Sequence, residues 1–506
     1  MQNGRDVNRV CEKTRNYFGE KRASRALTSL LKPIRLNKLR QFDEERSVQH
    51  TMAQKTEAAM LMTEGSIARK LVKFALPAFW GNLFQQLYNI VDSLVVGNLL
   101  GSEALAAVGS SSSLIFLIVG FFYGAFSGAG VVVSRFFGAR DDENVSRAVH
   151  TTVALGVISG IAVSIVGVLL APQILLWMGT PEDVLPNSLT YLRIYFGGVI
   201  TTILYNTVSG IMQAVGDSKH PLYYLIVSSA INVVLDILFV GPLHMGIAGA
   251  AWATVIAQAI SAALGLLRLT RVQGSYRVEL KRVRIHGRLL RQILTLGVPS
   301  GIQNSIIALA NLVVQSNINA FGSMAMAGCG AYSKIEGFGF LPVNSFSLAL
   351  TTFIGQNLGA KEYDRARRGG KLGVLTCAIL AEVIGLTMCA CAPLLIAAFD
   401  STPEVVAIGV KQSRTIMPFY FLLAMSHGLA AVMRGAGKSV VPMLVMLVCW
   451  CIIRVAYITL IVRVVPDIQA IFWAYPLTWT LSSAALGWYY LHGDWVHSFE
   501  KSKNQD

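Results

Sequence analysis

Hydrophobic segments long enough to cross a bilayer recur from Leu71 almost to the C-terminus, with short polar stretches between them. A transmembrane helix needs about 20 predominantly apolar residues. The strict two-residue alternation that is typical of membrane β-strands is absent. The pattern predicts an all-α integral membrane protein with about twelve transmembrane helices, centred near residues 85, 120, 160, 200, 230, 258, 304, 340, 382, 420, 451 and 480.

The first apolar segment, residues 71–100, carries polar side chains along one face. At 100° per residue, one broad face holds Asn82, Gln85, Gln86, Asn89, Asp92 and Ser93. An aspartate in the middle of a membrane helix costs about 3 kcal/mol on insertion scales, so it usually faces a cavity or an ion path. We therefore expect Asp92 to have a function in transport or ion binding rather than in helix packing.

The chain repeats itself with an offset of 221 or 222 residues. This offset aligns Pro77 with Pro299, Gly138 with Gly359, Pro221 with Pro442 and Trp252 with Trp473. Each half then has six helices, and because six is even, the two halves enter the membrane from the same side. Parallel repeats around a central cavity are typical of transporters.

The repeat divides the chain into parts. We predict a first lobe at residues 66–270 (helices 1–6), a basic linker at 271–288, a second lobe at 289–492 (helices 7–12) and a C-terminal tail at 493–506. Residues 1–65 are polar and basic, and we expect them to be disordered or to precede the true start of the protein.

The composition agrees with a membrane protein and excludes nucleic-acid binding as the reason for the positive charge. Of 506 residues, 54% are hydrophobic and 14% charged, and the net charge is +15. The basic residues lie in the N-terminal segment and in alternate loops, among them Arg140, Lys361 and Arg434. This bias predicts that both termini are cytoplasmic. The seven cysteines lie mostly within apolar segments and are expected to be packing thiols.

Polar residues of the first half lack polar equivalents of the same kind in the second. Asp92 aligns with Val314 and Asp236 with Tyr457. The same holds for Asn206 with His427, Asn232 with Ile453, and Thr254 with Tyr475. Two carboxylates with amide and hydroxyl oxygens can bind Na⁺ or share a proton, so we predict a cation site in the first lobe. The alternative for Asn206, Asn232 and Thr254 is hydrogen bonding between helices.

Other polar residues within the spans are candidates for the wall of the central cavity. In the seventh span Gln303, Asn304, Asn311 and Gln315 share one face, and in the first span Asn82, Gln86 and Asn89 do so. Helix packing is the alternative for each. Charged residues deep in a membrane usually pair, so we predict a structural ion pair between Glu336 and Arg454, with substrate contact as the alternative.

The sequence resembles the multidrug and toxic compound extrusion (MATE) transporters, in their bacterial branch. The resemblance covers roughly residues 64–490 and rests on the motifs LPAFWGNLFQQLYNIVDSLVVG, SRFFGAR with IGQNLGAK, MQAVGDSKHP with MRGAGKSVVP, and NVVLD. It implies a twelve-helix, two-lobe fold in the bacterial plasma membrane. It also implies export of bulky lipophilic, often cationic compounds by alternating access, in exchange for Na⁺ or H⁺.

The resemblance further implies roles for particular residues. The cation site would consist of Asp92, Asn206, Asn232, Asp236 and Thr254, and the first helix would bend at Pro77. We expect a monomer with small-molecule substrates, with no enzymatic activity, no cofactor, and no metal other than a coupling Na⁺. A flippase for a lipid-linked saccharide is the alternative function. An acidic cavity would favour cation export, and a basic cavity would favour the flippase.

Overall fold

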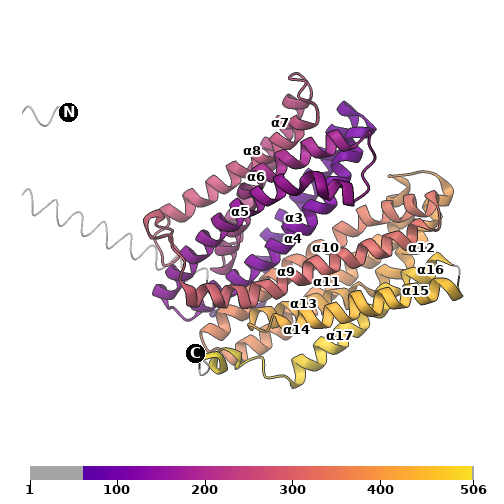
Figure 1. Cartoon of the computed structure of the whole chain (residues 1–506). Coiled ribbons are helices and arrows are strands. Elements are labelled where there is room, and N and C mark those ends of the chain that lie inside the picture. The colour runs from indigo at the N-terminus through magenta and orange to yellow at the C-terminus, as the bar shows by residue number, and fades with distance from the viewer. Residues whose placement is uncertain (1–60, 466, 504–506) are drawn as a thin grey trace, which may run out of the picture. The chain divides into compact units, whose positions relative to one another are not determined.

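The computed structural model describes residues 61–465 and 467–503, and within these ranges every regular element is a helix. The N-terminal extension was predicted to comprise residues 1–65, and residues 1–60 of it lie outside the described ranges. The first lobe consists of six long helices (Figure 1): α3 (Ile67–Leu100), α4 (Ser102–Gly138), α5 (Asp142–Trp177), α6 (Leu185–Ala214), α7 (Lys219–Val240) and α8 (Gly246–Arg271). A linker with one short 3₁₀ turn, η1 (Leu280–Arg282), leads to the second lobe.

The second lobe begins with three long helices, α9 (Gly287–Asn319), α10 (Ser323–Gly359) and α11 (Tyr363–Ala397). Its tenth and eleventh spans are interrupted. The tenth comprises α12 (Pro403–Ile416), the 3₁₀ turn η2 (Met417–Phe419) and α13 (Tyr420–Gly435). The eleventh comprises α14 (Val440–Met446), the π-helical turn η3 (Leu447–Ile453) and α15 (Arg454–Val464). The chain continues through α16 (Ile468–Phe472), α17 (Ala474–His492) and α18 (Ser498–Lys503).

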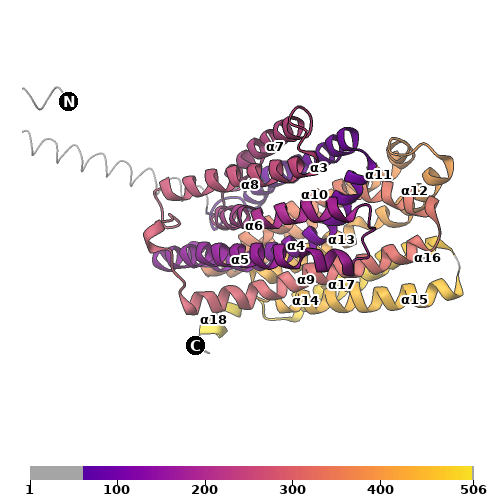
Figure 2. The same ribbon diagram turned by 45° about the horizontal axis from the view of Figure 1, so that its top comes forward.

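The predicted twelve-span, two-lobe fold is confirmed. Ten helical segments of the described ranges are long and apolar enough to span a membrane. The helices α3 and α17, which carry more polar residues, complete the twelve. In Figure 1, α5 to α8 lie on one side and α14 to α17 on the other, with α4, α9 and α10 between them, and Figure 2 shows the same bundle turned by 45°.

The break in the tenth span follows from its sequence. Pro418 lies within η2, and proline has no N–H to donate to the preceding turn. Beyond it, the free N–H of Phe421 donates to the Glu382 carboxylate of α11 at 2.9 Å. Glu382 thus satisfies a backbone N–H group that the proline break exposes.

The first helix of each lobe crosses into the other lobe. Near its start, α3 contributes Leu71 and Phe74 to the core of the second lobe. Farther along, Val96 belongs to a core of the first lobe, so Pro77 lies near the crossing point. The equivalent helix α9 does the reverse: it contributes Leu289 and Ile293 to the first lobe and Val314 and Ile318 to the second, with Pro299 between them. The lobe boundaries in the sequence are therefore not the boundaries of the two cores.

The lobes are in close contact at the end of the bundle where the loops 139–141, 215–218, 360–362 and 436–439 lie, which we call the basic end. A Cβ atom at Gly138 would overlap the Gln356 carbonyl, and one at Gly359 would overlap the Arg135 carbonyl. The Gln356 side-chain amide donates to the Ala214 carbonyl at 2.9 Å. Because helix backbones touch here without side chains between them, the interface between the lobes is closed at this end.

The segment before α3 joins both lobes at the basic end. In this segment, residues 61–66, which we call the strap, Leu61 lies in the first lobe's core and Met62 in the second lobe's core. The Met62 N–H donates to Gln356 Oε1 at 2.8 Å. The Arg365 guanidinium donates to the carbonyls of residues 62, 64 and 65 at 2.7 to 3.2 Å. Residues 61–65, assigned from the sequence to the N-terminal extension, therefore pack as part of the helical bundle.

Replacing Arg365 with alanine should loosen the strap while the rest of the protein stays folded. The variant loses its hydrogen bonds to three carbonyls, and losing hydrogen bonds from a charged donor costs about 1.5 to 3 kcal/mol. Hydrogen–deuterium exchange in residues 61–66 should therefore become at least about tenfold faster. Arg368→Ala, at an exposed position on the same helix, is the matched control. Unchanged exchange in Arg365→Ala would show that the core side chains alone hold the strap.

Candidate functional site

Four of the five predicted cation-site residues come together in the first lobe. Asp92 of α3 and Asp236 of α7 have their carboxyl groups within hydrogen-bonding distance of each other. Asn232 precedes Asp236 by one helical turn, and its Nδ2 donates to Asp236 Oδ2 at 2.8 Å. Asn232 Oδ1 accepts the N–H of Thr254 in α8 at 3.2 Å, and the amide orientation follows from satisfying both groups. Three helices thus build one acidic cluster, in which Asp236, Asn232 and Thr254 are buried and Asp92 is half-buried.

The acidic cluster has the chemistry of a cation or proton site. Asp236 is fully buried, and its Oδ1 has no hydrogen-bond partner among the described residues. Two adjacent carboxylates, one of them fully buried, favour a proton or a cation between them, because no basic group is shown to compensate their charges. Carboxylate and hydroxyl oxygens are hard ligands that suit Na⁺. The residues present therefore fit either coupling ion.

Two tyrosines that are not among the predicted site residues adjoin the acidic cluster. The Tyr88 hydroxyl lies near the Thr254 side chain and interacts electrostatically with both carboxylates. Tyr191 of α6 also interacts with Asp92 and Asp236. Tyr88 precedes Asp92 by one helical turn, so the spacing contained this signal. Nothing in the sequence near Tyr191 places it there.

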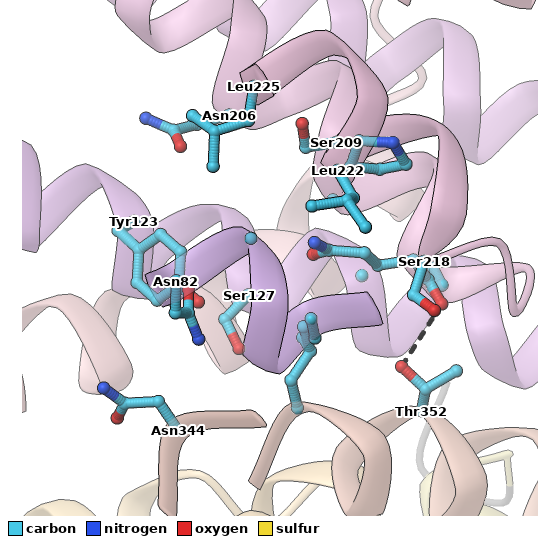
Figure 3. Close-up of a pocket in the computed structure, with 18 of the residues that line it drawn as sticks. Asn82, Tyr123, Ser127, Asn206, Ser209, Ser218, Leu222, Leu225, Asn344 and Thr352 are labelled. Atoms are coloured by element: carbon cyan, nitrogen blue, oxygen red, sulfur yellow. Dashed lines mark hydrogen bonds between the residues drawn. The ribbon is translucent and has the colours of Figure 1, made fainter. Parts of the chain in front are cut away.

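Asn206, the fifth predicted ligand, lines a cavity between the lobes instead (Figure 3). The cavity has a volume of about 140 Å³, enough for several water molecules but not for a bulky compound. Thr352 of the second lobe donates to the Gln213 carbonyl of the first at 3.3 Å beside it. Both lobes contribute to its wall, which includes Pro77, Asn82, Gln85, Tyr123, Ser127, Asn206, Ser209, Gln213, Asn344, Leu348, Thr351 and Thr352.

The predicted cavity residues are divided between the cavity and other contacts. Asn82 lines the cavity and donates to Ser345 Oγ of the other lobe at 3.3 Å. Two others also lie between the lobes: Gln86 lies against Gly337 of α10, and Asn304 donates to the Gly120 carbonyl at 3.1 Å. The remaining candidates make other contacts. The Gln303 side chain donates a hydrogen bond to the Met446 sulfur, and the Gln315 side chain donates one to Asn319. Asn311 accepts a hydrogen bond from Arg454, and Asn89 is exposed.

The predicted direct ion pair between Glu336 and Arg454 is not formed, and this prediction is corrected. The Arg454 guanidinium is buried between the rings of Trp450 and Tyr475, at 4.9 and 4.6 Å from their centroids. Its Nε and Nη2 both donate to Thr478 Oγ1, at 3.3 and 2.9 Å. Glu336 accepts from the Tyr332 hydroxyl at 3.3 Å and interacts with Arg454 only at longer range. Aromatic faces and a hydroxyl thus replace the expected carboxylate.

A two-lobe bundle of twelve membrane-spanning helices, with a cavity between the lobes and a carboxylate pair within the first lobe, defines a multi-pass membrane transporter. The MatE family model matches residues 77–238 and again residues 299–460, so the chain belongs to the MatE (MATE transporter) family. The two matches also coincide with the two repeats.

Known relatives agree with this assignment. The chain is 29% identical over 439 residues to the probable multidrug resistance protein YpnP of Bacillus subtilis, which covers 86% of this chain and 97% of YpnP. It is 24% identical over 346 residues to an FAD transporter of Shewanella oneidensis, covering 67% of this chain and 76% of that protein. Its fold matches an outward-facing MATE multidrug transporter with a TM-score of 0.80, at 20% identity, over 87% of this chain and 98% of the other.

Proposed function

We propose that this MATE-type transporter exports lipophilic small molecules from the bacterial cell in exchange for Na⁺ or H⁺. The observation that carries the proposal is the Asp92–Asp236 pair, with an unsatisfied buried oxygen, on helices that also form the cavity wall. Relatives named as multidrug resistance proteins support export of drug-like compounds. The FAD transporter among the relatives indicates that substrates vary within the family.

The coupling follows from the path of α3. This helix carries Asp92 in the first lobe, lines the cavity at Pro77 and Asn82, and starts in the core of the second lobe. A cation or proton at Asp92 and Asp236 removes their repulsion and lets α3 shift toward α7. Because Pro77 has no N–H to hold the helix straight, the shift bends α3 there and moves the cavity wall. Substrate and coupling ion then favour different states, which is what an antiporter requires.

Alternating access is the proposed cycle. The excess of basic residues in these loops supports a cytoplasmic position for the basic end, so the state with that end closed would release substrate outward. Return to the inward-open state requires the contacts of Gly138 with Gln356 and of Gly359 with Arg135 to separate. In the structure described, with the basic end closed, the cavity has a volume of about 140 Å³. A bulky substrate would fit only after the lobes move apart.

The saccharide flippase is less well supported. Such a protein needs cationic side chains in its cavity to hold a pyrophosphate. Among the described residues that line the cavity, none is Lys, Arg, Asp or Glu. The wall is therefore neutral, neither the basic cavity expected of a flippase nor the acidic cavity expected of a cation exporter, and Asp92 and Asp236 are not among the residues that line it.

Transport by purified protein in liposomes tests the proposed function. With ethidium as the probe, a Na⁺ gradient and a pH gradient are imposed separately across the membrane. We expect ethidium to move against the direction of one of these ions, and to stop moving when that gradient is collapsed by an ionophore. Ethidium movement equal to that in protein-free liposomes under both gradients would refute antiport of lipophilic cations.

A further inference from the structure

The linker between the lobes, residues 272–286, is held against α5 by defined contacts. His150 Nε2 accepts the Glu279 N–H at 3.0 Å, and the His286 N–H donates to Thr151 Oγ1 at 3.3 Å. In Figure 2 the chain runs from the end of α8 past the end of α5 to the start of α9. One side of the linker is therefore fixed to the first lobe.

The other side of the linker combines exposed apolar and exposed basic side chains. Leu280 and Ile285 are 70% and 42% exposed. Four basic side chains of the linker are exposed as well: Arg277, Lys281, Arg282 and Arg284. Glu279 is the one acidic residue of the linker and pairs with Arg282 at 3.0 Å, so four basic residues and one acidic residue give a net charge of +3. The linker is thus both basic and amphipathic.

The contacts with α5 place the linker at the level where a bilayer would begin. Arg147 is the last charged residue of α5, because residues 148–177 contain no Asp, Glu, Lys or Arg. His150 lies three residues beyond Arg147, which is about 5 Å along the helix axis. The linker therefore lies beside the boundary between the charged start of α5 and its apolar run, where lipid headgroups meet acyl chains.

The position of the linker at the basic end favours an anionic partner. The ring of Tyr276 packs on that of Phe137, two residues before the loop 139–141, with the centroids 6.3 Å apart. The cytoplasmic leaflet carries anionic lipids, and each basic residue near such a surface strengthens binding about fivefold. A second copy of this chain would present the same positive charge and would be repelled. Charge and depth therefore agree on lipid as the partner.

We propose that the linker docks on the membrane surface and binds the phosphate groups of anionic phospholipids, with Leu280 and Ile285 inserted among the acyl chains. The exposed basic side chains supply donors for the phosphates. Burial of the two apolar side chains in lipid accounts for their exposure in the protein. Because the contacts with α5 already fix the other side of the linker, lipid binding requires no change of fold. The proposal depends neither on the exported compound nor on the coupling ion.

A nitroxide spin label at position 280 tests the proposal. Full-length Leu280→Cys, in a background without native cysteines, is labelled and placed in nanodiscs of phosphatidylcholine or of an equal mixture of phosphatidylcholine and phosphatidylglycerol. The collision rate with oxygen, which concentrates in lipid, is divided by that with a neutral, water-soluble nickel chelate. We expect this ratio to be at least about threefold higher in the mixed nanodiscs, and the difference to disappear at about 1 M salt, where the Debye length is about 3 Å.

A second labelling site shows whether the effect belongs to the linker. Lys361→Cys lies at an exposed position of another loop of the basic end, and its label should be equally accessible to water in both kinds of nanodisc. Equal ratios at position 280 in the two lipid compositions, or an equal shift at position 361, would overturn the proposal. Protection of position 280 from both reagents would also overturn it, because protein rather than lipid would then cover the linker.

Removal of charge tests the headgroup contact separately from the apolar contact. Lys281→Gln with Arg282→Gln should raise the fraction of phosphatidylglycerol needed for half of the change at position 280 about tenfold, and Lys281→Arg with Arg282→Lys should keep the original fraction. Arg367→Gln with Arg368→Gln, two exposed positions near the start of α11, should change that fraction less than about twofold. No effect of the linker pair, or an equal effect of both Gln pairs, would refute a lipid site in the linker. These measurements use no substrate and no ion gradient, so export can fail while the lipid site stands, and the reverse.

Discussion

Asp236→Asn and Asp92→Asn should each reduce gradient-driven ethidium transport to the level of protein-free liposomes. Asparagine keeps the size and most hydrogen-bonding capacity of the acid but can neither release a proton nor supply a charge to Na⁺. The remaining carboxylate no longer has a like charge beside it, so ion entry no longer changes the repulsion between α3 and α7. Without that change, the coupling ion has no differential effect on the two states.

The stability of these variants distinguishes loss of coupling from loss of folding. A buried carboxylate is costly, so its neutral replacement should leave the unfolding temperature unchanged or raised. Asp142→Asn, an exposed acid in the first turn of α5, is the matched control and should transport like the wild type. Wild-type transport by both acidic-cluster variants under the same gradient would show that coupling occurs elsewhere. A lowered unfolding temperature would instead point to a structural role.

Gly138→Val should disfavour closure of the basic end and reduce transport about 5- to 150-fold. A side chain at this position would overlap the Gln356 carbonyl, so α4 and α10 have to move apart. Overpacking of this kind costs about 1 to 3 kcal/mol, which reduces the population of the closed state by about 5- to 150-fold relative to the open state. Gly359→Val should have the same effect, because this glycine meets the Arg135 carbonyl at the equivalent position of the repeat.

Labelling of a single cysteine measures the closure directly. Ala214 is buried beside Gln356 at the closed interface. In a background without native cysteines, Ala214→Cys should react slowly with a membrane-impermeant maleimide, and Gly138→Val should speed the reaction. Gly109→Val on the same helix is the control, because a Cβ atom there would meet no atom within 4 Å. Unchanged labelling in Gly138→Val would mean that the helices separate without opening the interface.

Much of the acidic cluster could be predicted from the sequence. Asn232 and Asp236 lie one turn apart on one helix, and their spacing alone places them on one face. The insertion cost of Asp92 indicated that it faces away from lipid. The repeat indicated that these residues belong to the first lobe only. Asn206, like Asn232, is an asparagine whose aligned position in the second half holds a different residue type. It nevertheless lies at the cavity, because the direction in which its side chain points depends on how α6 is rotated against its neighbours.

The sequence by itself determined the class and architecture of this protein. Twelve apolar segments, a repeat of 221 or 222 residues and polar positions confined to particular faces are local properties of the chain, and local hydrophobicity decides what crosses a bilayer. The tertiary structure decided which side chains meet. The crossing of α3 and α9 between the lobes and the aromatic partners of Arg454 depend on contacts between residues that are not neighbours in the chain. Periodicity defines the face of a helix but not the neighbour that the face will find.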